Sequence, residues 1–185
     1  VTIKAAEGAK PVLTGAEVPT NWSAGGDGKW STGKDMVRFC TVCTINADPA
    51  KEGVAAHPEQ VFVDGKPLTQ VLSRDEVTAS TFYVDDPDPV TLKNPNNNQA
   101  GYNAKPHRGT SYVIGVDPSQ HQVEVVQHSR ALSFNTDNIT LSGLTVEKYS
   151  AVQRWDYPDP EIGTISGGGM IVAAHGAPRI ENSTF

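Results

Sequence analysis

Apolar residues along this chain fall in short runs, and Gly, Pro, Asn or Asp interrupts each run. Runs of this kind, rich in β-branched residues, predict short strands bounded by turns. One helical turn is predicted at Pro67–Leu72. The pattern therefore predicts an all-β chain. The predicted strands are Val1–Ala5, Pro11–Thr14, Met36–Ile45, Gln60–Val63, Thr81–Val84, Ser111–Val116, Gln122–Gln127, Ala131–Phe134, Ile139–Leu141, Leu144–Val146 and Met170–Ala173.

Two segments in the last third of the chain resemble each other. Ile139–Val146 and Pro178–Phe185 align at an offset of 39 residues, and the strands predicted just before them keep the same order. Chance similarity between two β-rich segments is the alternative. The alignment pairs Leu141 with Ile180 and Thr145 with Thr184.

Gly143 and Asn182 occupy the same place in this alignment. Both residue types tolerate the left-handed backbone region, so each is predicted to form a bend between two strands. A strand, a bend and a second strand form the corner of a coiled parallel solenoid, one turn of which takes about 20–30 residues. The loop at 153–169 is expected to account for the longer offset.

The middle of the chain does not show this repeated strand–bend–strand pattern. From Trp22 to Gln127 the pattern indicates hairpins, with Asp64-Gly65 as a tight turn. Residues 85–108 are rich in Pro, Asn and Asp and are predicted to form a long exposed loop. We therefore expect first β-helix coils at 1–21, an inserted antiparallel β module at 22–127, and resumed coils at 128–185, apparently truncated at the C-terminus.

The amino-acid composition argues against several classes of fold and function. The 185 residues include 17 Gly and 13 Pro, and only 37% are hydrophobic, which disfavours a helical bundle. A net charge of −6 argues against binding to nucleic acid or to anionic lipid. No apolar run is long enough to span a bilayer, so no membrane insertion is expected. The start at Val1 suggests a fragment or a processed form.

Several of these segments together resemble a known arrangement. Val1–Gly15, Gln60–Leu68, Thr81–Asp85, Val123–Val125 and Ile139–Leu144 are similar to segments of secreted bacterial right-handed parallel β-helix proteins of the pectate-lyase-like superfamily. The nearest subgroup carries a β-sandwich inserted after the first coils, as in some β-xylosidase-like glycoside hydrolases. The resemblance implies a secreted, extracellular carbohydrate-active enzyme. In such families the catalytic carboxylates usually lie on later coils, so it assigns no catalytic residue here.

The loop at 153–161 is the best candidate for chemistry. Trp155 and Tyr157 alternate there with Asp156, Asp159 and Glu161. Sugars are held by aromatic rings and carboxylates, and a carboxyl pair can cleave a glycosidic bond. Asp156 and Glu161 are therefore weak catalytic candidates, and Trp155, Tyr157 and Asp159 are substrate-binding candidates. The alternative is a Pro-stiffened surface loop.

A histidine, a cysteine pair and an acidic cluster are further candidates for function. His175 is expected at a coil turn, where it either faces a substrate groove or caps the turn. Cys40 and Cys43 form a C-x-x-C motif, for which a local disulfide is favoured over a metal half-site or free thiols. Clustered acids at Asp85, Asp86 and Asp88 allow calcium binding, but solvated turn acids are the simpler interpretation. No other cofactor and no other metal is expected.

These observations lead to three functional hypotheses. The first is a glycoside hydrolase acting on an extended polysaccharide or oligosaccharide, because the loop at 153–161 offers paired carboxylates. The second is a polysaccharide lyase of the same fold, and the third is a non-catalytic carbohydrate-binding or adhesin module. The open end of a solenoid also suggests that a missing chain segment or a partner caps it.

Overall fold

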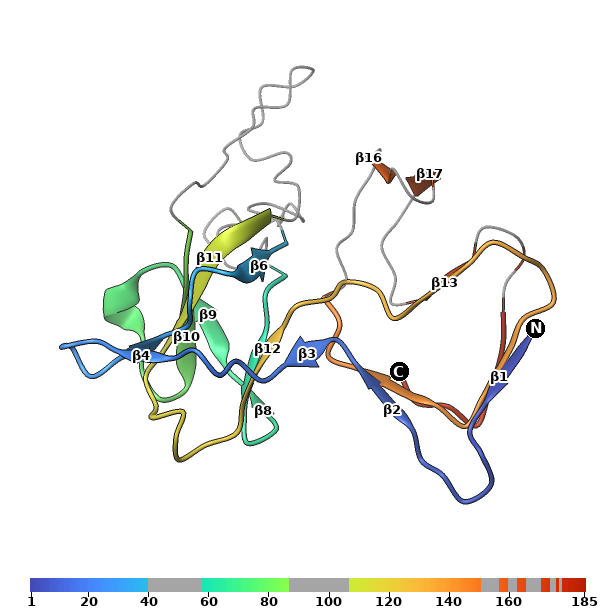
Figure 1. The fold of residues 1–185 in the computed structure, drawn as a ribbon, viewed down its shortest axis with the longest axis horizontal. Coiled ribbons are helices and arrows are strands. Elements are labelled where there is room, and N and C mark those ends of the chain that lie inside the picture. Colours follow the sequence, from blue (N-terminus) through green and yellow to red (C-terminus); the bar gives the residue numbers. More distant parts are fainter. Residues whose placement is uncertain are drawn as a thin grey trace, which may run out of the picture. The chain divides into compact units, whose positions relative to one another are not determined.

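The computed structural model describes residues 1–39, 58–86, 107–150, 157–159, 163–165, 171–173, 176 and 178–185. In this part of the chain the fold is all-β, and a 3₁₀ turn, η2 (Arg74–Glu76), is its helical element. No helix among these residues has the length and apolar character needed to cross a membrane. The chain divides into two compact units, residues 1–16 with 128–185, and residues 17–127 (Figure 1).

The first unit pairs its strands mainly in parallel. β14 lies between β1 and β19, β13 pairs with β18, and β15 pairs with β2. The strands are β1 (Thr2–Lys4), β2 (Val12–Thr14), β13 (Leu132–Phe134), β14 (Thr140–Ser142), β15 (Thr145–Glu147), β16 (Tyr157–Asp159), β17 (Gly163–Ile165), β18 (Ile171–Ala173) and β19 (Arg179–Glu181). The strands β16 and β17 form an antiparallel hairpin, which the sequence had suggested only as a loop.

The register of this unit confirms the alignment of the two similar segments. Leu141 pairs with Ile180 in the parallel ladder, and Thr145 forms a parallel bridge with Thr184. Gly143 has φ 72° and Asn182 has φ 49°, so both bends use the left-handed region as predicted.

One apolar cluster fills the interior of the first unit. Ile139, Leu141, Leu144 and Val146 are buried in it. Side chains from strands of all three parallel pairings, including Ile3, Leu13 and Phe134, pack against these four residues. Figure 1 shows β1, β2 and β13 on three sides of this interior. Each strand pair is too short to form a core, so stacking neighbouring strands is what buries the apolar residues.

The second unit contains two sheets. One has the order β4-β5-β11-β10-β9, with β6 also paired to β11, and the other has the order β3-β12-β7-β8. The strands are β3 (Ala16–Glu17), β4 (Ser23–Ala24), β5 (Trp30–Ser31), β6 (Met36–Arg38), β7 (Val61–Val63), β8 (Lys66–Pro67), β9 (Thr69–Val71), β10 (Thr81–Asp85), β11 (His107–Ile114) and β12 (Val123–Val126).

Two features of this unit differ from the sequence-based prediction. The segment Pro67–Leu72 is not a helical turn but contributes to β8 and β9, and the 3₁₀ turn follows at Arg74–Glu76. The Asp64-Gly65 turn closes the β7–β8 hairpin as expected, and this pairing draws the following residues into extended structure. The β9–β10 pair is parallel, so the sheet is mixed rather than purely antiparallel.

The two sheets of the second unit share one core. Val61, Val63, Val123 and Val125 come from β7 and β12, and they pack with apolar residues of the other sheet. Those residues are Met36, Phe82, Val84, Tyr112 and Ile114. In β10 the alternation of buried and less buried positions places Phe82 and Val84 on the core side. The unit is therefore a two-layer β structure with its own interior.

Candidate functional site

The residues singled out at 153–161 fall largely outside the described residues. Trp155, Asp156 and Glu161 lie outside them, as does His175. For the remaining two candidates, Tyr157 and Asp159, the structure gives the backbone. Both belong to β16, where Tyr157 is opposite Ile165 and Asp159 is opposite Gly163. These candidates stay predictions.

Most of the remaining candidate residues also lie outside the described part of the chain. Cys40, Cys43 and Asp88 lie outside the described residues. Asp85 ends β10, and the half-buried Asp86 follows it. Across the part of the chain that the structure describes, no group of three or more His, Cys, Asp or Glu residues is arranged to hold a metal ion.

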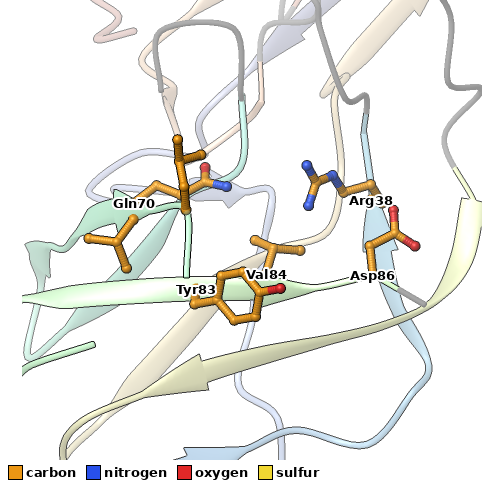
Figure 2. A pocket seen from close by; sticks show the side chains of 7 residues that line it. Arg38, Gln70, Tyr83, Val84 and Asp86 are labelled. Carbon is orange, nitrogen blue, oxygen red and sulfur yellow. The ribbon is translucent and has the colours of Figure 1, made fainter. Parts of the chain in front are cut away.

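The structure contains a pocket in the second unit that sequence reasoning missed. It has a volume of about 200 Å³ and is lined from three strands and the residues that follow them. Arg38 ends β6, Gln70 lies in β9, and Tyr83 lies in β10. Val71, Leu72, Val84 and Asp86 complete the lining. Figure 2 shows the Gln70 carboxamide and the Arg38 guanidinium directed toward each other across this space.

Arg38 is held rigidly at one side of the pocket. Its Nε lies 3.3 Å from Oε1 of Glu59, and the side chains are 6% and 0% exposed. The same Glu59 oxygen accepts a hydrogen bond of 3.1 Å from the Phe39 backbone N–H. The ion pair therefore neutralises two buried charges and fixes the guanidinium, because each partner would be costly to bury alone.

Tyr112 supports the strand that carries Arg38. Its hydroxyl donates a 2.8 Å hydrogen bond to the Val37 carbonyl, and its side chain is fully buried. Burial raises the pKa of this phenol well above its usual value, so the hydroxyl remains a donor at all ordinary pH values. The ring stacks on Phe82 at a centroid distance of 6.1 Å.

Gln70 has an unusual environment. The residue is 9% exposed, and its Oε1 is buried without a hydrogen-bond partner. It lies opposite Phe82 in the parallel β9–β10 register, which places it beside a core residue on an edge strand. A buried amide oxygen without a donor is unfavourable by about 1–3 kcal/mol. Such an exception calls for an explanation.

The opposite side of the pocket combines an aromatic ring with a carboxyl group. Tyr83 is half-buried, Val84 is 4% exposed, and Asp86 is half-buried just beyond the end of β10. Tyr83 and Val84 follow each other in β10, and Figure 2 shows the Asp86 carboxyl near Arg38. The pocket thus offers an apolar surface surrounded by hydrogen-bonding groups, which is the usual composition of a small-molecule site.

Sequence reasoning missed this site because its residues are far apart in the chain and share no motif spacing. One local signal was present. Gln70 lies between Leu68 and Leu72 at a spacing of two, where an apolar residue would continue the pattern of a strand. A polar residue at such a position marks either a partnered core group or a ligand contact.

Comparison with known proteins gives one result on the fold. No protein-family model and no curated protein matches the chain. A solved structure of XylC in complex with xylose matches 92% of the chain at a TM-score of 0.53 and 18% identity. The likeness concerns the fold alone. The chain corresponds to 28% of the length of XylC.

Proposed function

We propose that this chain forms the first coils of a right-handed parallel β-helix with an inserted β module, and that it belongs to a secreted carbohydrate-active protein. The observation that carries the proposal is the fold likeness to XylC, which extends over 92% of the chain. The matched XylC structure is a complex with xylose. A glycoside hydrolase acting on an oligosaccharide or polysaccharide is the function that we favour.

The parallel strand ladder supports the β-helix part of the proposal. Ile3, Leu141 and Ile180 occupy successive places across β1, β14 and β19. The bends at Gly143 and Asn182 repeat with the same backbone sign. Repetition of one strand–bend–strand unit on its neighbour is the defining feature of a solenoid. Further strands could stack on the exposed Ile180, which is 46% accessible at the edge strand.

The choice of a hydrolase depends on the residues between Gln153 and Glu161. Asp156 and Glu161 are proposed to supply the carboxyl groups that glycosidic cleavage needs, and Trp155 is proposed to stack on a sugar face. Tyr157, Asp159 and His175 are proposed to contact the substrate. Tyr157 and Asp159 belong to the β16–β17 hairpin.

The proposal predicts that the chain binds xylan and that any cleavage it performs depends on Asp156 and Glu161. The native chain should be retarded in gels that contain xylan, and sugar release from xylo-oligosaccharides should fall at least about 100-fold in Asp156→Ala or Glu161→Ala, since general acid–base catalysis contributes about 10²–10⁴-fold. The measurements are affinity electrophoresis and a reducing-sugar assay.

The exposed Asp137, on the same unit, provides the matched control. Asp137→Ala should bind and cleave as the native chain does. Absence of retardation by xylan and by every other polysaccharide in a plant panel would contradict the carbohydrate proposal. Retardation with no product would support a binding module in place of a hydrolase, and an unsaturated product detected by its ultraviolet absorbance would support a lyase.

A further inference from the structure

The parallel sheet of the first unit has two edge strands. β14 lies in the middle of the order β1-β14-β19, and within the described part of the chain β1 and β19 each pair with β14 alone. All three strands run in the same direction, so the two edges are opposite sides of one ladder. An edge strand presents backbone N–H and C=O groups to any strand that can pair with it.

Exposed apolar side chains gather at the two sides of this ladder. Among the described residues six large apolar side chains are exposed, and four of them belong to the first unit. Val1 precedes β1 and Val12 lies in β2, whereas Ile180 lies in β19 and Phe185 follows it. A strand stacked on either side would remove such side chains from water, which is favourable.

Backbone groups on the open side of β1 can be identified from its bonds to β14. The Val1 carbonyl accepts a hydrogen bond from β14, and the Ala5 N–H donates one to it. Alternate residues of a strand direct their N–H and C=O groups to opposite neighbours. The backbone groups of Thr2 and Lys4 are therefore directed away from β14, toward the open side.

The open side of β19 has the complementary pattern. The Arg179 N–H and the Glu181 carbonyl form hydrogen bonds with residues at the two ends of β14. The backbone groups of Ile180, between them, are therefore directed away from β14. In a parallel pair, Ile180 of one copy can accept from the Lys4 N–H of the next copy and donate to its Thr2 carbonyl.

This register also matches the side chains. It places Ile180 opposite Ile3, which extends the apolar row that Ile3 and Leu141 already form. It places the Glu181 carboxylate opposite the Lys4 ammonium. A slip by one residue would misdirect the backbone groups and set apolar side chains against charged ones.

Charge contributes less to this contact than the apolar residues and the backbone do. Glu181 already contacts Arg179, with Oε1 2.5 Å from Nη2, and the two side chains are 37% and 76% exposed. Ion pairs between exposed side chains contribute little to stability. The Lys4–Glu181 pair therefore favours one register, whereas the backbone bonds and Ile180 supply most of the attraction.

The second parallel pairing leads to the same arrangement. Thr145 pairs with Val12 on one side and forms a bridge with Thr184 on the other. A copy stacked in the register above would bring its Val12 over Thr184 and its Leu13 over Phe185. One displacement along the ladder therefore matches both strand pairings at once.

We propose that copies of this chain stack head to tail, with β1 of one copy paired in parallel with β19 of the next. The second copy takes the place that a further strand of the ladder would occupy. Because the two contacting surfaces are different, each copy keeps one open edge, and association continues beyond a dimer. The proposal rests on the parallel ladder and does not depend on the proposed carbohydrate function.

The test is sedimentation velocity of the full chain over a range of concentrations. The average mass should rise continuously and pass that of a dimer. Ile180→Lys should weaken association at least about tenfold, because the buried apolar contact is replaced by a charge. Lys4→Pro should weaken it as well, since it removes an N–H that β14 does not use. Leu72→Lys, at an exposed apolar residue of the second unit, is the control and should associate as the native chain does.

Mixing the two blocked variants tests the head-to-tail order. Ile180→Lys keeps an intact β1 edge, and Lys4→Pro keeps an intact β19 edge. An equimolar mixture should therefore form a 1:1 dimer and nothing larger. Circular dichroism of each variant checks its fold, and Val12→Lys replaces Lys4→Pro if the proline disturbs β1.

Three results would overturn the proposal. They are a native chain that stays monomeric at millimolar concentration, a dimer that does not grow with concentration, and association that Ile180→Lys leaves unchanged. Failure of two folded, blocked variants to form the mixed dimer would also overturn the pairing of β1 with β19. None of these results bears on retention by xylan, which tests the proposed function separately.

Discussion

Asp27 and Arg74 show how single side chains join separate segments of the second unit. Arg74 Nε donates to Asp27 Oδ2 at 2.9 Å, and its Nη2 donates to Oδ1 at 3.2 Å. Arg74 also donates to the Ser31 hydroxyl at 3.1 Å. This two-pronged contact ties η2 to the β4–β5 hairpin. The hydrogen bond from Arg74 is the largest cause that lowers the pKa of Asp27 to about 2.

The stability of the fold should depend on pH through the Asp27 carboxyl group. A carboxyl group with a lowered pKa stabilises the fold above its ordinary pKa of 3.8, and that stabilisation is lost as pH falls toward about 2. Asp27→Asn should therefore be less stable than the native chain near pH 6, and the difference should disappear as pH falls from about 4 to about 2. Urea unfolding at a series of pH values measures it.

Direct titration of the Asp27 carboxyl by ¹³C NMR provides the control. Its pKa should be about 2 in the native chain and should rise in Arg74→Gln. A pKa near 3.8 in the native chain, or a stability difference that persists at pH 2, would show that the contact with Arg74 contributes nothing through charge.

At the scale of elements, parallel stacking of strands determines which apolar residues are buried and therefore contribute most to stability. Leu141 is in β14, between Ile3 of β1 and Ile180 of β19. It is fully buried, whereas Ile180 is 46% exposed on the edge strand. Two residues at equivalent places in the repeated unit therefore differ in burial because one has a stacked strand on each side and the other on one side.

This difference predicts unequal effects of the same substitution. Leu141→Ala should lower the free energy of unfolding by about 2–5 kcal/mol, because it leaves a cavity in the cluster. Ile180→Ala should lower it by less than about 1 kcal/mol, since the side chain is already half in water. Urea denaturation of the two variants and the native chain measures both values. Equal effects would contradict the stacking order of β1, β14 and β19.

Much of this element structure was predictable from the sequence. The strands around Val61, Phe82, Val123 and Leu141 were all anticipated, because short apolar runs between turn residues have few alternatives. The Asp64-Gly65 turn was predictable from its chemistry. The helical turn expected at Pro67–Leu72 was wrong because cross-strand pairing, which involves residues elsewhere in the chain, outweighed local preference.

At the scale of the whole molecule, the second unit is an insertion into the first. The chain leaves the first unit after Ala16 and re-enters it at His128. The His128 N–H donates a 3.1 Å hydrogen bond to the Gly15 carbonyl, so the two connection points are adjacent in the first unit. An insertion with neighbouring ends need not disturb the unit that receives it.

The second unit should accordingly fold without the first. Its core cluster, from Met36 to Val125, lies entirely within residues 17–127. A protein of these residues alone should show dispersed NMR signals and a single cooperative thermal transition, as expected of a domain with its own core. The full chain, measured by circular dichroism in the same buffer, provides the reference. A broad, non-cooperative transition of the isolated segment would contradict its independence.

The sequence by itself determined the β class, most strands, and the repeat that places Leu141 beside Ile180, because these depend on local periodicity and on residues that permit a left-handed bend. Only the tertiary structure decided the pocket. Arg38 ends β6, Gln70 lies in β9, and Tyr83 and Asp86 lie in β10 and just after it, so their proximity follows from strand order and register. Pairing between segments that are distant in the chain sets both the strand order and the register, and no local sequence pattern encodes them.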